Sequence, residues 1–512
     1  MGVGGRMRGK PVVRLRGIAA AILLLAGTVV GAAMAQDQEE TFYRQRILEA
    51  WTAAQADAHA RADPLLQDVI ADARFGQLPE DDRRRLLSAA AWSAAHNGRL
   101  PAAAAWFAQV AELGSDDPDD WYRMSLVALD QHDQDAAARA MTILIGRWPE
   151  VLPNLSPDLV YPLAQQGDTS TPDRLAFQQA LFDANWKGGS AGTPSGIWYQ
   201  LARSRLSQGD MDRARIVARR ITDPGTLILM RADRRFDPVL DASSWRANVT
   251  HANVREIERA RRLAEAYPDQ LEPLVSLGHQ LLLGGQHEEA IALSDATLAR
   301  IASAPLDAPP FTDLDRQVWL MNYKSLALRR MGRIEEAVDE LRRASQLGEN
   351  GQPNVSQALN LGSLECDRGN AEAALAAAAV AGEADMSPYG QAVRAAIRHC
   401  AALQLGDQPA AAAALKELAG LVDDAPIRYL EALLLGEQPD QAADLMRKLL
   451  ASESERSEAL EWAQDCRLPE PLAVQVRERA LRQAFLARDD IVDAINAVGR
   501  VERYDLYCHI NG

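Results

Sequence analysis

The sequence predicts an all-α protein, an α-α superhelix in which antiparallel helix pairs stack one after another. Aromatic residues make up only 5% of the chain while 47% is hydrophobic, a balance that favours closely packed helices over β-sheets. Apolar and small residues also recur at a fixed spacing through most of the 512 residues. Because a repeat array enlarges its core by stacking, this length does not require several globular domains.

Residues 1–35 are predicted to form a secretory signal peptide. Five Arg and Lys residues come first without an acid, and an apolar stretch runs from Ile18 to Val30. Small residues at 33–35 then place the cleavage site before Gln36. We therefore expect an exported protein of the periplasm or cell envelope.

An uncleaved membrane anchor over residues 17–35 is the alternative. About 20 apolar residues span a bilayer, and this segment comes close to that length. Gly27 and Gly31 weaken a helix beside the cleavage site, which favours removal of the segment. A role as a membrane-anchored assembly component, and any membrane contact, depends on retention of these residues.

The predicted mature chain is strongly acidic. Of the 55 Lys and Arg residues, five lie in the first 35, so 50 remain against 71 Asp and Glu and the formal charge is −21. Such a surface repels phosphate backbones, and the arginine clusters at 83–85 and 259–262 are flanked by acids. The sequence therefore predicts no nucleic-acid partner.

Helix pairs are predicted from Trp121 onward by a constant spacing. Apolar and small residues follow this tryptophan at offsets of 3, 4, 7, 16, 20 and 23, and Pro149 stands at offset 28. The same register recurs from Trp198 and from Leu274. The turn between the two helices of each pair is predicted where a glycine precedes a polar or acidic residue and then an alanine. Glycine ends the first helix, the acid favours the start of the second, and alanine lets the two approach closely. Further turns of this kind lie at 332–337, 369–374, 403–409 and 433–439.

These offsets resemble the tetratricopeptide repeat, in which anchors of helix A meet alanine and a large apolar residue of helix B. The resemblance covers roughly residues 89–149 and 196–450, and it implies a solenoid of helix pairs. Several units lack the aromatic anchor, so they depart from the family pattern. The run from Met230 to Pro238 also resembles a group of uncharacterised exported bacterial tetratricopeptide proteins. Neither resemblance implies an activity.

Composition changes divide the chain into five segments. Gly, Ser and Pro crowd one stretch, which we expect to be a flexible linker between two helical blocks. The last segment is expected to cap the final repeat, because terminal units need a modified outer face. The segments are a signal peptide at 1–35, an amino-terminal helical block at 36–185, the linker at 186–196, the main array at 197–450 and a helical cap with a tail at 451–512.

The candidate binding residues lie on helix A of three repeats. A solenoid of helix pairs has a concave face lined by helix A, and residues one and five positions after the first anchor should face it. An aromatic beside a cation suits an extended peptide, whose carbonyl groups and apolar side chains need both kinds of contact. These candidate groove residues are Tyr122, Leu126, Tyr199, Arg203, Val275 and His279.

Four cysteines allow three disulfide pairings, and an exported chain permits them. Cys366 and Cys400 lie about one repeat apart, so a bridge there would join neighbouring helices. The other two are Cys466 and Cys508, and the sequence leaves the pairing open.

Ser190 is the one candidate nucleophile, since residues 188–192 fit the G-x-S-x-G pattern. That motif works on a strained turn after a buried strand, and residues 183–187 are not an apolar strand. A hydrolase centred on Ser190 is therefore the weaker alternative to a linker. The eight histidines are scattered without metal-ligand spacing, and no phosphate loop follows the signal region, so we expect neither metal nor cofactor.

Together these features predict a noncatalytic scaffold that binds a protein or peptide partner. Binding would bury a partner segment against helices that repeat stacking has already ordered. The partner's identity and the oligomeric state are left open by the sequence.

Overall fold

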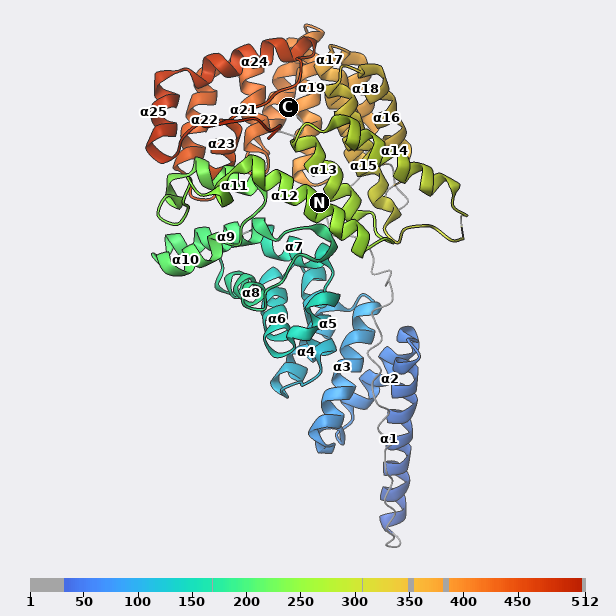
Figure 1. Cartoon of the computed structure of the whole chain (residues 1–512). Coiled ribbons are helices and arrows are strands. Elements are labelled where there is room, and N and C mark those ends of the chain that lie inside the picture. Colours follow the sequence, from blue (N-terminus) through green and yellow to red (C-terminus); the bar gives the residue numbers. More distant parts are fainter. Residues whose placement is uncertain (1–31, 168, 306, 349–353, 381–385, 509–512) are drawn as a thin grey trace. The chain divides into compact units, whose positions relative to one another are not determined.

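The computed structural model describes most of the chain, and Figure 1 shows its course. The apolar stretch Ile18 to Val30, predicted as part of a signal peptide, lies outside the described residues. The first helix, α1 (Ala32–Gln55), runs through the predicted cleavage site before Gln36. The described residues are 32–508 without 168, 306, 349–353 and 381–385.

The chain divides into two compact units, which we call the amino-terminal and the carboxy-terminal unit. The division falls between Trp186 and Lys187, inside the segment 186–196 that was predicted as a linker. That segment also contains a short 3-10 helix, and helix α9 begins at Ser195, which is buried. The last residues of the predicted linker are therefore helical.

The helices of the amino-terminal unit follow one another with short connections. They are α1, α2 (His59–Ala71), η1 (Phe75–Gln77), α3 (Glu80–His96), α4 (Leu100–Glu112), α5 (Pro118–Asp130), α6 (Gln134–Arg147), η2 (Pro149–Asn154), α7 (Pro157–Gln165) and α8 (Pro172–Asp183).

The carboxy-terminal unit holds the longer array and two short strands. Its first elements are η3 (Gly189–Ala191), α9 (Ser195–Ser207), α10 (Met211–Ala218), α11 (Pro224–Ala232), η4 (Arg234–Phe236), η5 (Trp245–Ala247), α12 (Val249–Ala266), α13 (Glu272–Leu283), α14 (His287–Ser303), η6 (Leu314–Arg316), α15 (Gln317–Arg330) and α16 (Ile334–Gln346). The remaining elements are α17 (Val355–Arg368), α18 (Ala371–Val380), α19 (Pro388–Gln404), α20 (Gln408–Ala419), α21 (Pro426–Leu435), α22 (Pro439–Ala451), α23 (Arg456–Trp462), β1 (Asp465–Cys466), α24 (Ala473–Leu486), α25 (Asp489–Val498) and β2 (Arg503–Tyr504).

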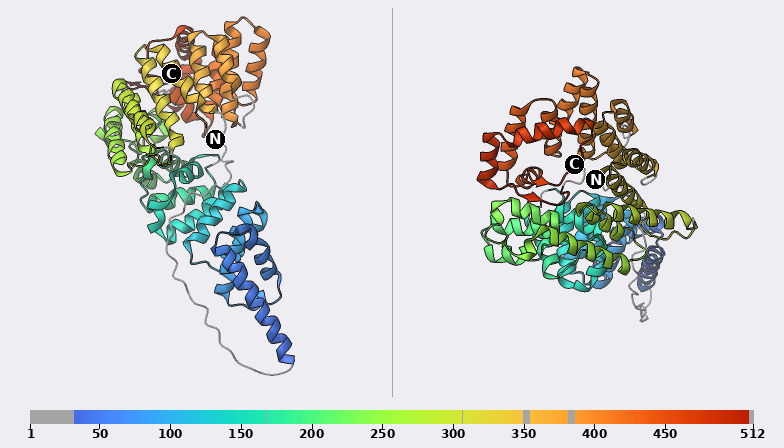
Figure 2. Two further views of the ribbon diagram at one scale, coloured as in Figure 1. Left: turned by 90° about the vertical axis from the view of Figure 1, so that its right-hand side faces the viewer. Right: turned by 45° about the horizontal axis from the view of Figure 1, so that its top comes forward.

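Neighbouring helices pack as antiparallel pairs, which confirms the predicted all-α superhelix of helix pairs. Figure 2 shows the successive pairs from two further directions. In the carboxy-terminal unit the first helices of successive pairs, α13, α15, α17, α19 and α21, contact one another in turn, more closely than the second helices do. The first helices, or A helices, are therefore the inner layer of the curved array.

The turn inside most pairs takes a left-handed backbone conformation, and glycine supplies it at most of these turns. Gly98, Gly332 and Gly406 have φ of 74°, 78° and 72°. His132 occupies the same position between α5 and α6 with φ of 61°. Because a side chain at positive φ costs roughly 1–2 kcal/mol, the predicted role of glycine at these turns has a physical basis.

One predicted turn is shifted by a residue. The near-duplicate sequences at 403–409 and 433–439 suggest that Gly406 and Gly436 serve alike. Gly436 instead has φ of −78° as the cap of α21, and Glu437 takes the left-handed conformation with φ of 56°. The reason is that α21 extends one residue further along the shared pattern than α19 does.

The three predicted anchors occupy equivalent places in their helices. Trp121 in α5 and Trp198 in α9 are buried near the helix start. Leu274 in α13 is half-buried and packs against the buried cluster that contains Phe311 and Leu320. A common phase of the repeats is therefore visible in the packing, as the spacing predicts.

The carboxy-terminal array closes on itself. Helix α25 packs on α22, and α23 packs on α11, so the last helices contact the first part of the array (Figure 2). Ala232 at the end of α11 and Leu460 in α23 are fully buried in one apolar cluster. Gly499 passes so close that a Cβ atom there would lie 2.5 Å from the Ala232 carbonyl oxygen. Within the segment predicted to cap the last repeat, α23 therefore contacts α11.

Two disulfides tie this unit together. Cys366 in α17 is bonded to Cys400 in α19, the pair that the repeat spacing suggested. Cys466 in β1 is bonded to Cys508 in the tail, by which we mean the described residues after α25. All four cysteines are therefore paired in the described residues. Within those residues, no helix combines the length and apolarity that crossing a bilayer requires.

Replacing His132 by glycine is expected to stabilise the protein by about 1 kcal/mol, because glycine adopts the left-handed turn without steric cost. Chemical denaturation of the two proteins measures the difference. Gly332→Ala, at the same turn position with no neighbour within 4 Å of the added Cβ atom, should lower the free energy of unfolding by a similar amount. Equal stability of all three proteins would contradict this account of the turns.

Candidate functional site

Two of the predicted groove residues lie on α5 of the amino-terminal unit. Tyr122 and Leu126 lie one turn apart on α5, and both side chains are half-buried. Between them in sequence, Arg123 places its guanidinium carbon 5.2 Å from the ring centre of Trp92 on α3. Trp92 is also half-buried, as is Arg123. We call these four residues the α3–α5 face.

The α3–α5 face is partly buried. Burial raises the pKa of the Tyr122 hydroxyl, and burial also raises the pKa of the Asp119 carboxyl despite the nearby Arg123. Asp119 lies 3.9 Å from Arg123 and keeps 45% of its side chain exposed. Partly buried groups that retain solvent contact are suited to a partner that replaces this water.

Two stacked histidines lie beside this face. The rings of His59 and His96 are 3.9 Å apart, and His96 meets the edge of Trp92 at 4.5 Å. Burial and the neighbouring His96 lower the pKa of His59. No group of three or more His, Cys, Asp or Glu able to hold a metal occurs among the described residues. The geometry of the two histidines is that of stacked rings.

In the carboxy-terminal unit, Tyr199 and Arg203 are covered by the chain itself. The Tyr199 hydroxyl is hydrogen-bonded to Ser457, and its ring stacks on Phe236 at 5.0 Å. Arg203 donates to the carbonyl oxygen of Ser454 at 3.4 Å. Both partners belong to the chain itself, since Ser454 lies in the loop before α23 and Ser457 lies in the first turn of α23.

Val275 and His279 occupy different environments on α13. Val275 is buried in the cluster that contains Leu320. His279 is half-buried, lies 5.9 Å from the Tyr323 ring, and has its pKa lowered by burial. The structure therefore brings Tyr122 with Leu126, and Tyr199 with Arg203, into pairs, whereas Val275 belongs to the core.

A charged cluster that sequence reasoning missed lies where α24 crosses α17 and α21. Asp367 of α17 accepts a hydrogen bond from Gln475 of α24 at 2.9 Å and lies 3.4 Å from Arg329. Arg428 and Glu431 of α21 form an ion pair of 3.2 Å. No local sequence pattern identifies this cluster, because its members are brought together by the return of α24.

The carboxylates of this region bind protons more tightly than ordinary carboxylates. Burial raises the pKa of Asp367 to about 6, although Arg329 and Arg428 act in the opposite direction. Burial, with Asp367 and Glu431, raises the pKa of Glu478 in α24 to about 8. Burial and the acidic neighbours Glu458 and Asp223 raise the pKa of Glu461 to about 7.

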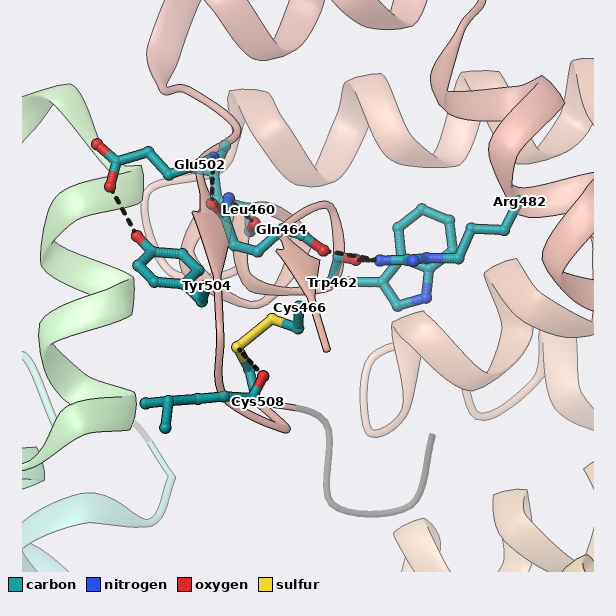
Figure 3. Close-up of a disulfide and its surroundings, with 9 residues drawn as sticks. Leu460, Trp462, Gln464, Cys466, Arg482, Glu502, Tyr504 and Cys508 are labelled. Atoms are coloured by element: carbon teal, nitrogen blue, oxygen red, sulfur yellow. Dashed lines mark hydrogen bonds between the residues drawn. A yellow bond between two sulfur atoms is a disulfide. The ribbon is translucent and has the colours of Figure 1, made fainter. Parts of the chain in front are cut away.

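The tail is held by polar contacts as well as by a disulfide, as Figure 3 shows. Gln464 is fully buried, and both the nitrogen and the oxygen of its side chain form hydrogen bonds. Its amide nitrogen donates to the Leu460 and Arg500 carbonyl groups at 2.6 and 3.0 Å, and its oxygen accepts from the Glu502 amide at 2.9 Å. Arg482 covers the Trp462 ring at 4.9 Å. A fully satisfied buried amide fixes the path of the tail.

Ser190 does not occupy a nucleophile elbow. It lies in the short 3-10 helix η3, between α8 and α9. The strands found in the described residues are β1 and β2, far along the chain. The strand-to-helix turn that the motif requires is therefore missing at Ser190, and the hydrolase hypothesis loses its geometric support.

No protein-family model and no curated protein matches the chain. Among solved structures, the crystal structure of the APC/C hetero-tetramer Cut9-Hcn1 is similar, with 11% sequence identity and a TM-score of 0.29. The match covers 89% of this chain and 89% of that chain. The α-α superhelix is established by the helix pairs, the turns and the buried anchors.

Glu478→Gln is expected to flatten the pH dependence of stability. The folded state keeps the Glu478 proton up to about pH 8, whereas the unfolded chain loses it near its ordinary pKa of about 4.5. The stabilising contribution of the Glu478 proton is therefore fully present below pH 4.5 and is lost as the pH rises through 8. An amide at this position does not titrate, so it removes this loss. Facing groups are Asp367, Glu431, Arg428 and Arg329.

Thermal unfolding between pH 5 and pH 9 measures this effect. The matched control is Glu372→Gln on the exposed side of α18, which should keep the wild-type profile. Identical profiles for the wild type and Glu478→Gln would mean that the charged cluster does not raise the pKa of Glu478.

Proposed function

We propose that this chain is an exported, noncatalytic scaffold of the periplasm or cell envelope that binds a peptide segment of a protein partner. The α3–α5 face is the observation that carries this proposal. Its residues lie on α3 and α5 and are all half-buried: an aromatic hydroxyl, an arginine 5.2 Å from a tryptophan ring, and an apolar side chain. An extended peptide needs these contacts for its carbonyl groups and apolar side chains.

The proposed compartment has two independent supports. The amino-terminal sequence has the three regions of a secretory signal peptide. Both disulfides link cysteines within the carboxy-terminal unit, and such bonds persist in oxidising compartments and are rare in reducing ones. The resemblance of residues 230–238 to exported bacterial tetratricopeptide proteins agrees with this compartment.

The proposed binding mechanism uses pre-ordered helices. Repeat stacking holds α3 and α5 in place before a partner arrives, so binding spends little free energy on ordering the site. Burial of partner side chains against Trp92 and Leu126 would provide the apolar contribution, and Arg123 would meet partner carbonyl or carboxylate groups.

Photo-crosslinking in the native envelope tests the proposal. A benzoylphenylalanine residue at position 122 should capture a protein partner, and mass spectrometry then identifies the crosslinked segment. The matched control places the same residue at Phe42, an aromatic of α1 with 62% exposure. Capture at position 42 alone would contradict the assignment of the site.

A synthetic peptide of the captured segment should then bind Tyr122→Ala and Leu126→Ala proteins at least about tenfold more weakly than the wild type. Phe42→Ala should bind the peptide like the wild type. Equal affinities for all four proteins would remove the α3–α5 face from the proposed function.

A further inference from the structure

The end of the tail occupies a specific site at the turn between α13 and α14. The Tyr507 amide donates to the Leu283 carbonyl oxygen at 3.0 Å. Leu506 and Tyr507 are buried, with 4% and 5% exposure. The tail therefore docks through both its main chain and its side chains, as a bound peptide does.

The Tyr507 ring is surrounded by groups that recognise an aromatic side chain. The guanidinium carbons of Arg330 and Arg467 lie 4.3 and 4.8 Å from the ring centre. The His287 ring lies 5.2 Å from it. Burial, with Arg330 and Arg467, lowers the pKa of His287 to about 4, so its ring is neutral at pH 7. Two cations and a neutral ring are a suitable environment for an aromatic π-system.

Gly285 permits the close approach of the tail. Its φ is +75°, and a Cβ atom there would lie 3.1 Å from Arg467 Nη1 and 3.3 Å from Tyr507 Cε2. At Gly332, with φ of +78°, an added Cβ atom meets nothing within 4 Å. Two glycines with the same backbone requirement therefore differ in whether they contact the tail.

The disulfide that holds the tail is the more accessible of the two. Cys508 is half-buried, whereas its partner Cys466 has 7% exposure. Both cysteines of the other disulfide, Cys366 and Cys400, are buried, with 2% and 8% exposure. A reductant in solution therefore meets the tail disulfide first, since exchange requires access to a sulfur atom.

We propose that the Tyr507 site is a second peptide-docking site, which takes an aromatic residue of a partner segment, and that the Cys466–Cys508 disulfide keeps the chain's own tail in it. This inference rests on the proposed peptide-binding function but uses a different site from the α3–α5 face. Reduction of the bond frees residues 505–508 to leave, while the Gln464 contacts still hold residues 500–502.

A dithiol performs the opening reaction. Its thiolate attacks the Cys508 sulfur, the Cys466–Cys508 bond breaks, and Cys466 leaves as a thiolate. The second thiol of the reductant then resolves the mixed disulfide. The two cysteines gain two electrons and two protons, and the dithiol is oxidised to a disulfide.

Hydrogen exchange and peptide binding with the full chain test the proposal. The probe is a fluorescent peptide of residues 499–508 with serine for Cys508, and a second peptide carries alanine for Tyr507. In the Cys466→Ser/Cys508→Ser protein, exchange at the Tyr507 amide should rise at least about tenfold relative to the oxidised wild type. The first peptide should bind this protein, and the alanine peptide should bind at least about tenfold more weakly. Dithiothreitol should give the wild type the same behaviour.

The matched control is Cys366→Ser/Cys400→Ser, which removes the other disulfide and should leave tail exchange unchanged. A second pair keeps both disulfides. Gly285→Ala should increase exchange at the Tyr507 amide, whereas Gly332→Ala should not. Unchanged exchange in Cys466→Ser/Cys508→Ser would contradict the proposal that this disulfide keeps the tail in its site. The aromatic site would be contradicted if both peptides bound the Cys466→Ser/Cys508→Ser protein equally well. It would also be contradicted if the first peptide bound the oxidised wild type as tightly as it binds that variant. Neither outcome would affect the crosslinking test at position 122, which concerns the other site.

Discussion

Each helix pair of this array has an apolar side that only the next pair covers, so an array needs a cover for both of its ends. In the carboxy-terminal unit the two ends cover one another. Ala232 of α11 and Leu460 of α23 are fully buried in the same cluster, although 228 positions separate them in the chain. The burial of apolar side chains at this closure is what allows the polar contacts of Gln464, the return of α24 and the docking of Tyr507.

The closure also explains why equivalent repeat positions have different roles. Tyr122 and Tyr199 each follow an anchoring tryptophan, so they share a place in the repeat. Tyr122 is half-buried, while Tyr199 is hydrogen-bonded to Ser457 and has 3% exposure. One repeat position is therefore half-buried in the amino-terminal unit and hydrogen-bonded to α23 of the same chain in the carboxy-terminal unit.

Features that depend on local chemistry could be predicted from the sequence. The helix pairs, the buried Trp121 and Trp198, and the left-handed glycine turns follow from spacing and from backbone sterics. The shift from Gly436 to Glu437 could not be predicted, since it depends on where α21 ends. The contact of Tyr199 with Ser457 spans 258 positions, and the raised pKa of Glu478 requires α24 to lie on α17 and α21, so no repeat pattern contains either.

Native-state hydrogen exchange of Leu460→Ala tests the closure most directly. Removal of this fully buried side chain should destabilise the α23 contact by about 2–5 kcal/mol. If the two ends depend on one another, the amides of α11 should lose protection together with those of α23, while those of α15 and α16 should change less. Loss of protection confined to α22–α25, with α11 unchanged, would contradict the account.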